Sequence, residues 1–167
     1  MIRGRDKVPR RYIPNYLSRK DKKIIKYELN KSRSKYKKGI YYTRKNVKSF
    51  KPKTSQHILN ARKLYGVENI IPNKILAFKT GCSVKALKKI ENKGMGAYYS
   101  SGSRPNQTAQ SWGIARLASA ITSGKAAAVD YNILEEGCKP KSKALTLAKR
   151  ARVKHGHGTR RVPKVNM

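Results

Sequence analysis

The chain has 167 residues and carries 41 Lys and Arg against 8 Asp and Glu, so its formal net charge is +33 at pH 7. This length suits one domain of about 100 residues with extensions and is too short for a multidomain enzyme. Because so large an excess of one charge repels itself in a free compact fold, we expect the protein to lie against an anionic partner.

Several classes of protein are disfavoured by the composition. There are two cysteines, Cys82 and Cys138, fewer than a disulfide framework needs, so reduced and buried thiols are expected. No apolar run is long enough to cross a bilayer. The first residues also lack the apolar stretch of a secretory signal, so we expect no such signal.

The positive charge is concentrated at the two ends of the sequence. Residues 1–53 hold 20 Lys and Arg and 3 acids, whereas residues 54–138 hold 11 and 5. Residues 139–167 hold 10 Lys and Arg and no acid. The pattern predicts a mainly α protein in which a small helical core domain, residues 54–138, lies between two long basic arms.

The N-terminal arm is rich in tyrosine and broken by prolines, which predicts a segment that becomes ordered on a partner surface. One helix is expected in it, capped by Ser18, with Asp21 in its first turn and an end near residues 32–34. Tyrosines among basic residues suit nucleic-acid binding and protein contact equally. The expected arm contacts are Tyr12, Tyr16, Tyr36, Tyr41 and Tyr42, with Arg160 and Arg161 of the C-terminal arm.

The middle of the chain is expected to hold short helices separated by glycines. They are bounded by Thr54 or Ser55 and Gly66, by Asn73 and Gly81, and by Ser83 and Gly94. The spacing of Ala77, Gly81 and Leu87 is compatible with a helix-turn-helix, although a plain αα-hairpin is the favoured interpretation. The second helix of this pair would present Lys85, Lys88 and Lys89.

Residues 94–108 form a Gly- and Ser-rich stretch that also contains Tyr98, Tyr99 and Arg104. Its amides and Arg104 could form an anion site, or its tyrosines could pack on the core while the rest forms a structured loop. We favour the loop, because the spacing fits neither a P-loop nor a dinucleotide-binding motif.

The second half of the core is expected to centre on a helix capped by Asn106 or Thr108. It should run through residue 123, be the longest helix, and place Arg116 at the surface or against an acid such as Asp130. The remaining elements expected are an extended segment over 125–129, a helix over 131–136 capped by Asp130, and a basic helix over 142–153.

Catalytic signals are weak. His155 and His157 lie in a glycine-rich basic tail without neighbouring cysteine or carboxylate ligands, and no carboxylate pair is evident in the core. We therefore expect no catalytic residue, no cofactor, no metal site and no small-molecule substrate. An enzyme that uses the Gly/Ser stretch and Arg104 stays open as a less favoured alternative.

A distinctive string connects part of the chain to a known family. It consists of KGMGAYYSSGSRPNQT at 93–108, Ser111-Trp112, ARLASA at 115–120, Gly124-Lys-Ala and Val129-Asp130. With these residues, the segment from about 75 to 138 resembles an uncharacterised domain family of large double-stranded DNA viruses. The resemblance implies a viral context, with the virion as the expected location, and it transfers no catalytic residue.

Charge and resemblance together lead to a functional expectation. The protein is expected to be a minor structural protein on the inner side of a viral capsid, present in the host cytoplasm during assembly. Its basic arms would contact major and other minor capsid proteins, and genomic DNA or an anionic inner membrane surface. The alternative is a virion protein that binds and condenses DNA by phosphate neutralisation. A ribosomal-type RNA-binding protein has a matching composition but no matching module.

Overall fold

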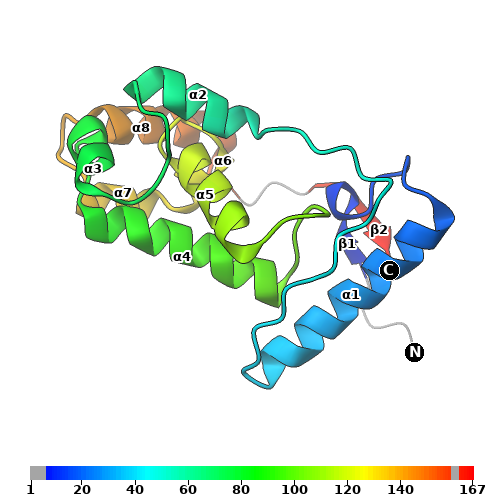
Figure 1. Cartoon of the computed structure of the whole chain (residues 1–167). Helices are drawn as coiled ribbons and strands as arrows, with labels where there is room; N and C mark the ends of the chain where they lie inside the picture. The colour runs from blue at the N-terminus through cyan, green and yellow to red at the C-terminus, as the bar shows by residue number, and fades with distance from the viewer. Residues whose placement is uncertain (1–6, 159–161) are drawn as a thin grey trace. The chain divides into compact units, whose positions relative to one another are not determined.

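The computed structural model describes residues 7–158 and 162–167. Within them the chain is mainly helical, as expected, with eight α-helices and one two-stranded sheet (Figure 1). It divides into two compact units. Unit 1 contains the described residues 7–53, 96–109 and 162–167, and unit 2 contains 54–95 and 110–158.

Unit 1 joins the two ends of the chain in a small antiparallel sheet. Its elements are strand β1 (Lys7–Pro9), the 3-10 helix η1 (Arg10–Tyr12), helix α1 (Arg19–Lys37) and strand β2 (Lys164–Asn166). Val8 of β1 is fully buried and lies opposite Val165 of β2. Residues 7–53, expected to become ordered on a partner, thus fold together with segments of their own chain.

Helix α1 begins where the sequence predicts and ends later. The Ser18 hydroxyl accepts a hydrogen bond from the Asp21 backbone N–H at 3.1 Å, which caps the first turn. The helix continues to Lys37, past its expected end, because Ile25, Leu29 and Ser32 keep one face buried. Gly39 follows with a positive φ of 76°, a conformation suited to the end of a helix.

Unit 2 packs short helices around one apolar core. They are α2 (Gln56–Tyr65), α3 (Lys74–Thr80), α4 (Val84–Ser100), α5 (Ala109–Ala120), α6 (Lys125–Val129), α7 (Tyr131–Gly137) and α8 (Lys143–His155). The last residues of α4 and the first of α5 belong to unit 1. The fully buried large side chains of the unit 2 core include Leu76, Leu87, Ile90, Leu117 and Ile121.

The predicted ends of α2 and α3 are confirmed, whereas the end predicted for α4 is wrong. Gly66 and Gly81 end α2 and α3 in the left-handed conformation. Helix α4 instead passes through Gly94, because that glycine lies against α5. A Cβ on Gly94 would lie 2.7 Å from the Cα of Gly113, so the absence of side chains lets the two helices approach closely.

Three further expectations are corrected by the structure. Helix α5 ends at Ala120 and is shorter than α1 and α4. Residues 125–129 form helix α6 and not an extended segment, since alanines with high helix propensity bury two methyl groups there. Cys82 and Cys138 are joined in a disulfide and are not reduced thiols, because backbone hydrogen bonds between the flanking residues bring the two segments together.

Candidate nucleic-acid interface

The described acidic side chains of unit 1 lie inside it. Asp21 is 7% exposed and Glu28 is 3% exposed. One oxygen of Asp21 accepts hydrogen bonds from the backbone N–H and the hydroxyl of Ser49. One oxygen of Glu28 accepts from the Tyr42 hydroxyl at 2.8 Å and from the Lys45 backbone N–H at 3.1 Å. Both carboxylates therefore fasten residues 42–49 to helix α1.

The ionised form of Asp21 is favoured by this arrangement. Hydrogen bonds from the Ser49 side chain and backbone lower the pKa of Asp21 below its usual 3.8, and they outweigh the opposing effect of burial. The charge of Asp21 is thus used within the fold. Its carboxylate is 7% exposed and is held by Ser49, so it is not among the groups that a phosphate would contact directly.

The exposed charged side chains of unit 1 are, among the residues described, all Lys and Arg. On α1, Lys20, Lys23 and Lys37 lie on the solvent face together with Tyr27, which is 63% exposed. The others are Lys7, Arg10, Arg11, Arg19, Lys38, Lys45, Lys48, Lys51, Lys53, Arg104 and Lys164. This segregation leaves a surface of one sign, which attracts polyanions.

The tyrosines expected to contact a partner fall into two groups. Tyr16, Tyr36 and Tyr41 are exposed, and Tyr41 is the most exposed of the three. Tyr12 is buried and Tyr42 is half-buried, so these two stabilise the unit and do not offer a free ring face. Arg160 and Arg161, named from the sequence as further contacts, lie outside the described residues.

Arg44 connects three separate segments of unit 1, a role that the sequence analysis did not predict. Its guanidinium donates hydrogen bonds to the Ser32 hydroxyl, the Tyr98 carbonyl and the Ser103 hydroxyl at 2.7–2.8 Å. It also lies 3.8 Å from the centre of the Tyr98 ring, a cation–π contact. Burial lowers the pKa of Arg44, yet its distributed hydrogen bonds compensate the buried charge.

The Gly/Ser stretch turns out to be half helix and half loop. Residues 94–100 continue α4, with Tyr98 fully buried and Tyr99 half-buried. In the loop, the Asn106 side chain accepts from the Val47 N–H at 2.7 Å and donates to the Val47 carbonyl at 2.9 Å. These contacts favour the structured loop over an anion nest. The side chain of Arg104 is exposed.

Unit 2 presents a row of basic residues on α4. Lys85, Lys88, Lys89 and Asn92 are exposed and recur at helical spacing. They line an open depression along the helix together with Val84 and Lys93. The lysines singled out from the sequence therefore share one face, opposite the buried Leu87 side of α4.

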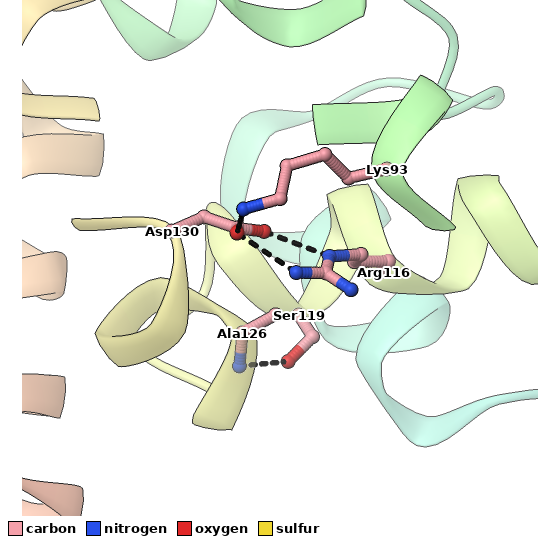
Figure 2. Close-up of polar contacts among 5 residues, drawn as sticks. All are labelled: Lys93, Arg116, Ser119, Ala126 and Asp130. Atoms are coloured by element: carbon pink, nitrogen blue, oxygen red, sulfur yellow. Dashed lines mark hydrogen bonds and ion pairs between the residues drawn. The ribbon is translucent and has the colours of Figure 1, made fainter. Parts of the chain in front are cut away.

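A buried ion cluster connects α4, α5 and the junction of α6 and α7 (Figure 2). The Asp130 carboxylate is completely buried and accepts hydrogen bonds at 2.8 Å from Arg116 Nε, Arg116 Nη2 and Lys93 Nζ. Nearby, the Ser119 hydroxyl accepts from the Ala126 N–H. The predicted pairing of Arg116 with Asp130 is confirmed, and it occupies the Asp130 side chain that was expected to cap α7.

The electrostatics of Asp130 follow from competing effects. Burial alone raises its pKa, but the hydrogen bonds from Arg116 and Lys93 outweigh burial, so the pKa lies below the usual 3.8. Asp130 is consequently ionised at neutral pH. The hydrogen bonds of Arg116 and Lys93 to Asp130 hold α4 and α5 against the junction of α6 and α7.

Two further features can be examined in the part of the chain that the structure describes: groups of metal-binding side chains and membrane-spanning helices. There is no group of three metal-binding side chains within it. His157 lies 3.2 Å from Arg152, and His155 ends helix α8. Within residues 7–158 and 162–167, no helix is both long and apolar enough to cross a bilayer.

Comparison with known proteins places the chain in a family. A family model described as a family of unknown function (DUF5824) matches residues 9–135. The chain belongs to the DUF5824 family. No curated protein and no solved structure matches it. The matched range includes residues 44–47 as well as Tyr98, Ser103 and Asn106, which are hydrogen-bonded to them.

Proposed function

We propose that this DUF5824 protein binds nucleic acid through the cationic surface of unit 1, and that it does so as a virion protein of a large double-stranded DNA virus. The observation that carries the proposal is the segregation of charge: Asp21 and Glu28 are buried, whereas Lys and Arg cover the surface. Neutralisation of backbone phosphates needs an array of this kind and no base-specific contact.

The viral setting rests on the resemblance of the 93–130 string and on the net charge of +33. A chain with this charge is accommodated where phosphate is dense, as around a packaged genome. We place it on the inner side of the capsid, where the genome lies.

The test is the salt dependence of DNA binding by the full chain. Affinity for a 30-bp duplex of random sequence should fall steeply with NaCl, with a log–log slope near −7 if about eight phosphates are contacted. Replacing Lys20 and Lys23 by Gln should weaken binding and make the slope shallower by about 2. The control replaces Arg62 and Lys63 of α2 by Gln, which removes the same number of positive charges from unit 2.

Several outcomes would contradict the proposal. A weak salt dependence would show that phosphates are not neutralised. Equal effects of the α1 and α2 pairs would show that net charge and not the unit 1 surface decides the affinity. Binding to vesicles of anionic lipid without binding to duplex DNA would assign the surface to a membrane.

A second candidate is a minor capsid protein that lines the shell, and an apolar stripe in unit 2 favours it. Ile75 and Phe78 lie about one turn apart on α3 and Ile71 precedes the helix, with exposures of 64%, 85% and 39% in that order. Exposed apolar groups of this size are typical of protein contacts. This role predicts that cross-linking in purified particles joins α3 to a major or minor capsid protein, and that Phe78→Ser removes the cross-link.

A further inference from the structure

The pair formed by α3 and α4 has the residue pattern of a helix-turn-helix. Residues 81–83 connect the helices, and Gly81 adopts a left-handed φ of 78°. The side chains that face the interior are Leu76 and Thr80 of α3, Cys82 of the turn, and Leu87 and Ile90 of α4, all less than 5% exposed. A short turn containing Gly between two such helices is the arrangement in which the second helix reaches DNA.

The outer face of α4 presents polar side chains that can bind phosphates and base edges. Lys85, Lys88 and Lys89 are exposed together with Asn92, within little more than two turns. Lysine can donate to phosphates and to guanine O6 and N7, and an Asn amide can pair with adenine. The one acid of α4, Glu91, is half-buried beside this row and interacts electrostatically with Lys88.

The beginning of α4 is held firmly. The Ser83 hydroxyl accepts from the Ala86 N–H at 3.1 Å and caps the helix. The Ser83 N–H donates to the Gly137 carbonyl at 2.8 Å, and the Lys139 N–H donates to the Gly81 carbonyl at 2.9 Å. With the disulfide between the same two segments, these bonds fix the turn before any ligand arrives.

We propose that α4 docks in the major groove of duplex DNA with Lys85, Lys88, Lys89 and Asn92 toward the bases and flanking phosphates. An α-helix is about 10–12 Å across and fits the major groove of B-form DNA, which is about 12 Å wide. The deep and narrow major groove of A-form RNA does not admit it. The inference rests on the proposed function: unit 1 supplies general affinity for phosphates, and α4 adds preference for B-form duplex.

The experiment compares three 20-bp ligands of one sequence with the full chain. They are unmodified duplex DNA, the same duplex with glucosylated 5-hydroxymethylcytosine, whose sugars fill the major groove, and double-stranded RNA. We expect the unmodified duplex to bind at least about tenfold more tightly than either other ligand. In a variant with Lys85→Gln, Lys88→Gln and Lys89→Gln, the ratio of the affinity for unmodified duplex to the affinity for either other ligand should fall to about one.

A variant with Lys20→Gln, Lys23→Gln and Lys37→Gln is the control of equal charge, because it changes three exposed lysines of unit 1 and none on the outer face of α4. It should weaken binding to all three ligands and preserve their ratio. Unchanged circular dichroism and thermal midpoint would confirm that both variants fold. Equal wild-type affinity for the open and the blocked duplex would overturn the docking of α4 while leaving the proposed function intact. Absence of binding to every ligand would overturn both.

Discussion

Replacement of Asp130 by Asn tests the buried ion cluster of unit 2. The substitution keeps the shape of the side chain and removes its charge, and it places an amide N–H₂ where Arg116 and Lys93 now donate. Breaking a buried ion pair costs about 3–5 kcal/mol. Because the Arg116 and Lys93 side chains are 23% and 45% exposed and can regain water, we expect the lower end, about 3 kcal/mol.

The assay is thermal and urea unfolding at pH 7, with Glu135→Gln as the control. Glu135 is an exposed carboxylate of α7, so its change should stay within about 0.5 kcal/mol. For a chain of this length, the loss expected for Asp130→Asn corresponds to a midpoint about 6–12 °C lower.

The difference in unfolding free energy between wild type and Asp130→Asn should depend on pH, and this dependence separates the effect of charge from that of packing. Since the pKa of Asp130 is lower in the folded chain than in the unfolded one, its stabilising effect is complete above the unfolded value. The effect is lost as the pH falls through the folded value. The free energy of unfolding of wild type should therefore exceed that of Asp130→Asn by a constant amount from pH 7 to about 4.5. This excess should shrink on further acidification. An excess no larger than that of the control, or one independent of pH down to acid unfolding, would refute the reasoning.

Three further predictions follow from particular contacts. Gly94→Ala should destabilise the fold by about 1–3 kcal/mol, because the added methyl group would clash with Gly113. Gly96→Ala should stabilise α4 by up to about 1 kcal/mol, because the space around Gly96 is open. Urea unfolding of both variants checks that the two changes in stability have opposite signs. Arg44→Met should cost about 3 kcal/mol by leaving buried acceptors without a donor, as measured by the unfolding midpoint. Thiol titration of the denatured, unreduced chain should find Cys82 and Cys138 both oxidised, and free thiols would contradict the disulfide.

Local signals in the sequence predicted the ends of several helices. Ser18 and Asn73 act as caps, and Gly66 and Gly81 stop their helices, because each effect depends on a few neighbouring atoms. Gly94 has the same local signature but lies inside α4, since its role depends on α5, whose contact is distant in sequence. Periodicity alone does not distinguish a glycine that ends a helix from one that lets another helix approach.

The candidate interface was predictable only where the exposure of a residue depends on its neighbours in the sequence. The exposure of Lys85, Lys88 and Lys89 follows from helical spacing against the buried Leu87. The burial of Arg44 does not, because it depends on acceptors far along the chain, at Tyr98 and Ser103. In a basic segment, the neighbouring residues do not show whether a given Lys or Arg is buried in the fold or faces a ligand.

The placement of acids explains how so basic a chain can fold before it meets a polyanion. Asp21, Glu28 and Asp130 are buried where hydrogen bonds hold loops and helices together. Each buried carboxylate stabilises the fold through internal N–H groups, hydroxyls and cations, and it places no negatively charged group where a phosphate would touch the surface. An exposed acid would offset repulsion between surface lysines but would also repel phosphate. In unit 1 the described acids Asp21 and Glu28 both point inward, so stability and polyanion affinity make compatible demands there, whereas unit 2 keeps Glu68, Glu135 and Glu136 exposed.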